Sequence, residues 1–342
     1  MVKLQQLVIA LVSLSFSGCV VKSKLPAIAP DVISENVKYD TDDPSIWVNQ
    51  ADASQSIIFG TDKDTDGAIF AFDLQGKILK DKCITGIQRP NNVDLRYDFP
   101  LTDSTRTAII AFTERERKML RIYSVPDMQP LDGGGFPVFA DAASEEEQFP
   151  MGIALYHSQN DGSFYAIVGR KSGPKTDYLY QYKIKPKDAG SVGVDLVRKF
   201  GKFSGRKEIE AIAVDDALGY VYYSDEMECV RKYQAEPNAG KEELACFGAG
   251  DFQEDIEGIA IAAYSDGSGY ILVSDQQRGQ FNIYDRKTNE MLKAVNLSTT
   301  ETDGCDAVTV TLNETFSNGL FVAMNDEGNF YFYDLGKILE GL

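Results

Sequence analysis

The stretch EAIAVDDALGYVYYSDEMECVRKYQ (210–234) contains three short segments rich in Val, Ala and Tyr, separated by turn residues. Short runs of β-branched and aromatic residues between turns are typical of consecutive β-strands. The third segment ends in an aromatic residue, and segments of this type recur along the chain. Their aromatic residues are Phe72, Tyr123, Tyr182, Tyr233, Tyr284 and Tyr333, at intervals of 51, 59, 51, 51 and 49 residues.

The two other strand types also recur six times. The middle type reads IIFGTDK, IIAFTER, YAIVGRK, YVYYSDE, YILVSDQ and LFVAMND, and the type before it reads DPSIWV, NNVDL, MGIAL, EAIAV, EGIAI and DAVTV. Six copies of about 50 residues, each a small β-meander, predict an all-β, six-bladed β-propeller of four- to five-stranded antiparallel sheets. A β-sandwich with extra strands is the alternative, which six copies in phase disfavour. No segment between residues 40 and 342 has a convincing helical periodicity.

The two ends of the repeat region suggest how the ring closes. The sequence DLQGKIL follows the first aromatic strand, and DLGKIL follows the last one near the C-terminus. We therefore predict that segment 31–40 adds a strand to the last blade.

The N-terminus has the features of a secretion signal. Lys3 precedes an apolar run, and small residues precede Cys19. The expected organisation is a signal peptide (1–18), a lipidated N-terminus and linker (19–33) and the propeller (34–342). Acylation of Cys19 would attach a protein secreted across the inner membrane to the cell envelope without spanning it. A free periplasmic or extracellular protein is the alternative, and we expect a monomer.

Four further cysteines are Cys83, Cys229, Cys246 and Cys305. An oxidising compartment permits disulfides, and Cys229 and Cys246 are the closest pair in sequence. Sequence alone does not determine pairing, so free thiols are an equal alternative.

Composition narrows the possible chemistry. The 342 residues include 52 acidic and 34 basic side chains, a net charge of −18, which argues against a nucleic-acid partner. The single histidine, His157, excludes zinc sites with two or more His ligands and catalysis by two histidines. Carboxylates, Lys, Arg and metal ions must therefore carry out any reaction.

The repeat allows equivalent positions to be compared between blades. At the entrance of the innermost strand they are Asp43, Asn91, Met151, Glu210, Glu257 and Asp306; at the end of the second strand they are Lys63, Arg115, Lys171, Glu226, Gln276 and Asp326. The second set is cationic in blades one to three and acidic in blades four and six. Such a separation of charge around a ring favours a functional site over ordinary exposed loop ends, which are the alternative.

The acidic half of this ring predicts a metal site. Its expected ligands are Asp42, Asp43, Glu210, Glu226, Asp255, Glu257 and Asp303. So many carboxylates can converge only if protons or cations neutralise them, and an excess of oxygen ligands favours several Ca²⁺ ions. The cations Lys63, Arg115 and Lys171 would face these ions and bind a polyanion such as a phosphate ester. A water activated by calcium and a carboxylate would then attack phosphorus in line.

Several motifs in this framework resemble those of a known family. They are DDPSIWV (42–48), RPNNVDLRYDFPL (89–101), LYHS (155–158), DIEGIA (255–260), IYDR (283–286) and FVAMNDEGNF (321–330). From about Asp40 to the C-terminus, the chain is similar to the β-propeller phytases, the calcium-dependent alkaline phytase family. The resemblance implies stepwise hydrolysis of phytate, or its calcium complex, to lower inositol phosphates and phosphate.

The resemblance also implies roles for single residues. Four residues match calcium-binding or water-activating carboxylates: Glu210, Glu226, Glu257 and Asp303. Asp255 matches a further acidic site residue, and Asp42 and Asp43 match an acidic pair beside calcium. The cations that match phosphate-contacting residues are Lys63, Arg115 and Lys171. We expect Glu210, Asp303, Lys63 and Arg115 to be catalytic and His157 to be structural. Glu35 matches an N-terminal calcium-bridging residue, at a different spacing.

Three departures from the family pattern concern substrate binding. Asp64 replaces a second Lys, Met151 replaces a phosphate-holding Tyr, and the acidic loop before blade six has one TDG where two are expected. These changes would weaken one phosphate position or shift the preference among inositol phosphates.

Two other functions remain open at this stage. Another calcium-dependent propeller hydrolase, such as a lactonase, would not need the three cations. A surface-anchored propeller that only binds a partner, with structural calcium, would not need a water-activating carboxylate.

Overall fold

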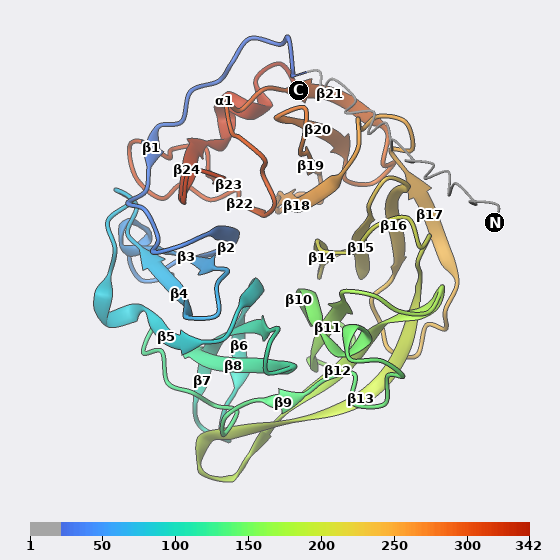
Figure 1. Ribbon diagram of the computed structural model, residues 1–342. Coiled ribbons are helices and arrows are strands. Elements are labelled where there is room, and N and C mark those ends of the chain that lie inside the picture. Colours follow the sequence, from blue (N-terminus) through green and yellow to red (C-terminus); the bar gives the residue numbers. More distant parts are fainter. Residues whose placement is uncertain (1–21) are drawn as a thin grey trace, which may run out of the picture.

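The computed structural model describes residues 22–342, which form six four-stranded sheets around a central channel (Figure 1). The predicted six-bladed propeller is confirmed, and each blade has four antiparallel strands. The predicted signal peptide and Cys19 lie outside the described residues, so secretion and lipidation stay predictions, as does the monomeric state. Within the described chain, no helix has the length and apolar character to cross a bilayer.

The strands run outward from the channel in each blade. Blade one contains β2 (Thr41–Trp47), β3 (Ile57–Asp62), β4 (Gly67–Phe72) and β5 (Ile84–Ile87). Blade two contains β6 (Pro90–Pro100), β7 (Arg106–Glu114), β8 (Met119–Val125) and β9 (Phe136–Pro137). Blade three contains β10 (Pro150–His157), β11 (Phe164–Arg170), β12 (Thr176–Lys187) and β13 (Ser191–Lys202).

The second half of the chain repeats this order. Blade four contains β14 (Ile212–Asp215), β15 (Tyr220–Asp225), β16 (Cys229–Gln234) and β17 (Glu243–Phe247). Blade five contains β18 (Ile256–Ala263), β19 (Gly269–Asp275), β20 (Gln280–Asp285) and β21 (Met291–Val295). Blade six contains β22 (Cys305–Val308), β23 (Leu320–Asn325), β24 (Asn329–Asp334) and, from the other end of the chain, β1 (Val32–Ile33).

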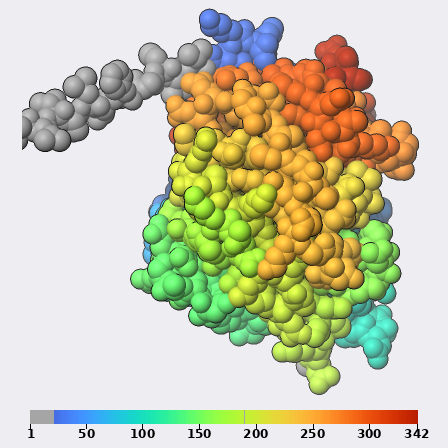
Figure 2. Space-filling model, turned by 90° about the vertical axis from the view of Figure 1, so that its right-hand side faces the viewer, coloured from blue at the N-terminus to red at the C-terminus, as the bar shows by residue number. Residues whose placement is uncertain are grey.

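The ring closes through β1, as the sequence predicted. Val32 pairs with Phe332 and Ile33 with Tyr331 on β24, and Figure 1 shows β1 beside β24. In Figure 2 the blue N-terminal segment lies at the top of the molecule, against the orange part of the chain. The preceding residues, predicted to be a linker, also contact the propeller. Ser23 N donates to Arg278 O at 2.9 Å, and Ile28 N donates to Asn296 O at 2.8 Å. The N-terminal segment therefore binds blades five and six.

The hydrophobic core is divided into six clusters, one at each interface between neighbouring blades. Aromatic rings meet across these interfaces, as in Phe99–Phe164 between blades two and three and Phe281–Phe321 between blades five and six, both with centroids 5.2 Å apart. Burial of both faces of a blade explains the continuous apolar runs of the middle strands.

The connections contain a few short helical segments. One-turn 3₁₀ helices occur at Ala53–Gln55, Lys80–Lys82, Glu146–Gln148 and Asp188–Gly190. The helix α1 (Leu335–Leu339) follows β24, and the Asp334 side chain accepts a hydrogen bond from Gly336 N at 3.0 Å. The sequence did not indicate α1, because five residues are too few to display a helical period.

Two of the four downstream cysteines are joined. Cys229 on β16 and Cys246 on β17 form a disulfide with a Cα–Cα distance of 5.6 Å, which settles the pairing that the sequence left open. Cys83 and Cys305 carry free thiols.

Candidate active site

Six equivalent hydrogen bonds place the second-strand residues around the mouth of the channel. The backbone N–H groups of Lys63, Arg115, Lys171, Glu226, Gln276 and Asp326 donate to carbonyls of Asp40, Arg89, Phe149, Glu208, Asp255 and Thr300, respectively, at 2.7–3.3 Å. Each carbonyl belongs to the segment that enters the innermost strand of the same blade. The predicted ring of six positions is therefore present, with its split between cationic and acidic side chains.

At the innermost strands, the structure corrects two of the six equivalent positions. In β2, Thr41 pairs with Asp62 and Pro44 with Gly60, so β2 has one residue more than β3 between these pairs. The same β-bulge occurs in β6, β10 and β18. Counting from the bulge makes Asp42, not Asp43, equivalent to Glu257. In blade six, the pairing of Cys305 with Ala323 likewise makes Asp303, not Asp306, the equivalent residue.

Two cations reach the carboxylates at the mouth. Lys63 Nζ lies 2.6 Å from Asp42 Oδ1 and 3.1 Å from Asp303 Oδ2. Arg115 Nη2 lies 3.8 Å from Glu210 Oε1, and Asn91 bridges the two by accepting from Arg115 and donating to Glu210. Both cationic side chains are largely buried, so they neutralise the carboxylates in a low-dielectric environment.

Lys171 occupies a different place from the other two cations. Its Nζ donates to Glu208 Oε1 at 2.7 Å, and its side chain is one-third exposed. Lys171 is therefore the most exposed of the three cations.

Three carboxylates from blades four and five form the centre of the acidic half. Glu210, Glu226 and Glu257 each offer an oxygen atom, and these atoms lie within 4.8 Å of one another. Glu257 Oε2 and Asp42 Oδ2 are buried without a hydrogen-bond partner. Because a buried anionic oxygen without a partner is costly, this arrangement fits a bound cation.

Burial and mutual repulsion alter the pKa values in this group. Burial, together with repulsion from Glu210, raises the pKa of Glu226 to about 8, although Lys207 acts in the opposite direction. Burial, together with repulsion from Glu226 and Glu210, raises the pKa of Glu257 well above its usual value. Burial also raises the pKa of Asp303. For Glu210, the opposing effect of burial is outweighed by Lys63 and Arg115, so its pKa is lowered. Glu210 is therefore ionised, while Glu226 and Glu257 require protons or a cation.

Comparison with known proteins agrees with this site. The family model described as Phytase matches residues 3–331. The 3-phytase of Bacillus subtilis (strain 168) is 32% identical over 298 residues, which cover 84% of this chain and 74% of the relative. The chain belongs to the phytase family. It is thus an enzyme of the phytase type, and the resemblance seen in the sequence motifs is confirmed.

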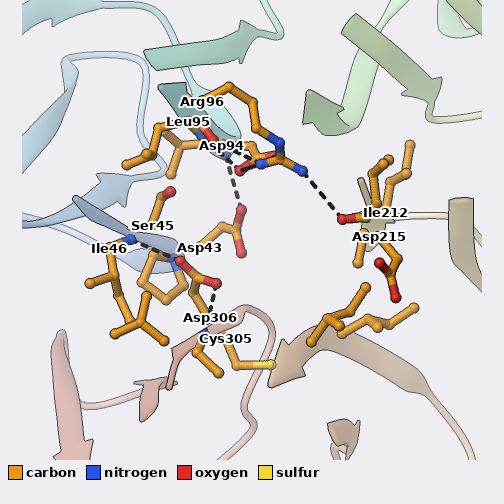
Figure 3. A pocket seen from close by; sticks show the side chains of 18 of the residues that line it. Asp43, Ser45, Ile46, Asp94, Leu95, Arg96, Ile212, Asp215, Cys305 and Asp306 are labelled. Atoms are coloured by element: carbon orange, nitrogen blue, oxygen red, sulfur yellow. Dashed lines mark hydrogen bonds and ion pairs between the residues drawn. The ribbon is translucent and has the colours of Figure 1, made fainter. Parts of the chain in front are cut away.

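In this phytase, Asp43 lies inside the channel rather than in the cluster at the mouth. Its Oδ2 accepts from Val93 N of blade two at 3.0 Å, and it faces Asp306 (Figure 3). Asp306 of blade six accepts from Ile46 N of blade one at 2.8 Å, and Asp94 of blade two accepts from Leu155 N of blade three at 2.7 Å. These carboxylates join the innermost strands of successive blades.

Other predicted residues are placed as follows. Asp255 is buried at the mouth and contacts Lys207 and Gln277. Glu35 accepts from Ile78 N at 2.9 Å and pairs with Lys77, and its contacts do not include the cluster. The imidazole of His157 stacks on Phe164 with centroids 4.1 Å apart, which agrees with the structural role expected for it.

Sequence reasoning missed three polar side chains at the mouth. Lys207 contacts Glu226 and Asp255, Gln276 donates to Asp303, and Gln277 donates to Asp255. Gln276 occupied a recognised repeat position and could have been assigned from it. Lys207 and Gln277 lie in connections that differ between blades, so no repeat signal identified them.

Proposed function

We propose that the chain hydrolyses phytate stepwise and in a calcium-dependent reaction at the channel mouth. The observation that carries this proposal is the Glu210–Glu226–Glu257 cluster, with a buried unpartnered oxygen on Glu257, beside the buried cations Lys63 and Arg115. A site with both features suits a substrate whose phosphates need cations and whose reaction needs an activated water.

Calcium fits the ligands better than zinc or magnesium. All candidate ligands are carboxylate oxygens, which hard cations prefer, and their number suits the six to eight ligands of Ca²⁺. We assign Glu210, Glu226, Glu257, Asp42, Asp255 and Asp303 to calcium binding. Calcium bound there would neutralise phosphoryl oxygens and lower the pKa of a nearby water.

The basic side chains at the mouth bind the phosphates of the substrate. Lys63 and Arg115 bind the oxygens of the phosphoryl group that is cleaved, with the planar Arg115 guanidinium offering two parallel donors. Lys171, at the rim, binds a neighbouring phosphate of the same substrate. Asp303 holds the Lys63 ammonium in position.

Glu210 is the base in this scheme because it lies 3.8 Å from Arg115, which binds the phosphoryl group, and Lys63 and Arg115 keep its pKa lowered. It accepts a proton from water as the water oxygen forms a bond to phosphorus. The bond between phosphorus and the inositol oxygen breaks, and that oxygen takes a proton from solvent. The products are phosphate and an inositol phosphate with one phosphate fewer, which can bind again.

The test is phosphate release from sodium phytate at neutral pH. Release should increase as calcium is added and disappear in EDTA. No release at any calcium concentration, from protein with the circular dichroism of a folded β-protein, would overturn the proposal. Lactone hydrolysis is less well supported, because it gives Lys63, Arg115 and Lys171 no role.

A further inference from the structure

Lys207 connects two blades at the edge of the acidic cluster. It lies in the connection between β13 and β14, and its Nζ is 3.1 Å from Glu226 Oε2 and donates to Asp255 Oδ2. Glu226 directly follows β15 of blade four, and Asp255 directly precedes β18 of blade five. One ammonium group therefore lies between two carboxylates that we assign to calcium binding.

The exposure of this ion pair is asymmetric. The side chains of Glu226 and Asp255 are 1% and 8% exposed, whereas that of Lys207 is 42% exposed. A lysine has a flexible four-carbon stem and a strongly hydrated head group. The ammonium group of Lys207 can therefore move into solvent, where its charge is hydrated. Lys63, at 14% exposure, lacks this freedom.

The ion pair between Lys207 and Glu226 also leaves Glu226 Oε2 without a well-formed hydrogen bond. An oxygen of Glu226 lies within 4.8 Å of oxygens of Glu210 and Glu257. Within residues 22–342, Lys207 is the only cation at ion-pair distance from either Glu226 or Asp255. It supplies the positive charge at the place where a divalent ion would bind the same oxygens.

We propose that Lys207 is a displaceable counter-ion that couples metal binding to substrate binding. When a divalent cation binds the Glu210–Glu226–Glu257 cluster, Lys207 leaves Glu226 and Asp255, because two cations repel each other at that distance. The released ammonium lies at the rim and binds a phosphate next to the one that is cleaved. This second step rests on the proposed phytate hydrolysis, whereas the competition with calcium does not.

The first experiment measures calcium binding without substrate. Lys207→Gln is titrated with CaCl₂ by calorimetry, beside the wild type and Arg206→Gln. Arg206 is the matched control, because it is the adjacent cation and forms an exposed ion pair with Glu228. Lys207→Gln should bind calcium roughly three- to tenfold more tightly, as the loss of a partly exposed ion pair predicts.

The control variants should behave differently. Arg206→Gln should keep the wild-type affinity, and Lys207→Arg should restore it by restoring the charge. Unchanged or weaker calcium binding in Lys207→Gln would overturn the proposal, since a permanent structural ion pair gives that result. Equal tightening in Arg206→Gln would also overturn it, because a general change in charge would then suffice.

The second experiment separates the two substrate positions. In Lys207→Gln the KM for phytate should rise several-fold with kcat little changed, while the KM for p-nitrophenyl phosphate stays the same. A single phosphate reaches only the position of cleavage, so equal changes in both KM values would contradict the role at a neighbouring phosphate. Failure of the wild type to hydrolyse phytate would refute the proposed function, and the calorimetric titration would still decide the competition.

Discussion

Inside the channel, Asp215 accepts hydrogen bonds from both Nε and Nη2 of Arg286 at 2.6 Å, whereas at the mouth Glu257 has a buried oxygen without a hydrogen-bond partner. The same contrast applies to their neighbours. Arg96 Nη1 donates to both oxygens of Asp94 at 2.9 Å (Figure 3), while Glu226 contacts only the half-exposed Lys207 among the cations of the described chain. The carboxylates in the channel are paired within the protein and hold the blades together. The carboxylates at the mouth are incompletely paired, and they would bind a cation from solvent.

This difference explains why acidic residues alone did not define the site. The motif DDPSIWV supplies Asp42 to the mouth and Asp43 to the channel, where Asp43 joins blade one to blade two. The partners of a carboxylate, not its presence in a motif, distinguish the two functions. The following experiments test that distinction.

The largest effect should come from removing the base at the mouth. Glu210→Gln should lower phytate hydrolysis by roughly 10²- to 10⁴-fold, because the variant loses both the proposed proton acceptor and an oxygen atom assigned to calcium binding. Circular dichroism and urea unfolding should show a folded protein, since the change also removes like-charge repulsion. Glu228 forms an ion pair with Arg206, and Glu228→Gln should retain activity within threefold. More than a tenth of wild-type activity in Glu210→Gln would contradict its role.

Removing a cation inside the channel should lower stability and leave activity nearly unchanged. Arg286→Met leaves Asp215 buried without a cation, which should lower the free energy of unfolding by about 3–5 kcal/mol. Activity per folded molecule should stay near the wild-type value, because Arg286 is not at the mouth. Urea unfolding monitored by fluorescence measures the loss. A change below about 1 kcal/mol would show that this ion pair does not hold blades four and five together.

The last prediction concerns the pH dependence of stability. Burial, with repulsion from Asp94, raises the pKa of Asp306 from 3.8 to about 7. Between these values the folded protein binds more protons at Asp306 than the unfolded chain does, so this residue's contribution to stability decreases as pH rises from about 4 to about 7. The decrease amounts to at most about 4 kcal/mol.

The variant Asp306→Asn isolates this contribution. In EDTA, the difference in unfolding free energy between wild type and Asp306→Asn should fall from pH 4 to pH 7 and then level off. A difference that is independent of pH would show that Asp306 titrates normally and that its hydrogen bonds to Ile46 N and Ala307 N outweigh its burial.

The sequence determined the propeller, the closure by the N-terminal strand, and the ring of Lys63, Arg115, Lys171 and Glu226. These features follow from local patterns: short runs of strand-forming residues and the turns between them recur at a nearly constant period, so equivalent positions can be counted along the chain. The resemblance to a family added the substrate class to this framework.

Only the tertiary structure decided which acidic residues meet at the mouth. A β-bulge adds one residue to a strand and reverses which side chains face a given side, so counting from the sequence selected Asp43 where the structure places Asp42. In blade six, the register of β22 against β23 places Asp303 where counting selected Asp306. The disulfide, the Arg286–Asp215 ion pair and the position of Lys207 also depend on contacts between segments far apart in the chain. Such contacts are set by the packing of whole blades, which no local pattern encodes.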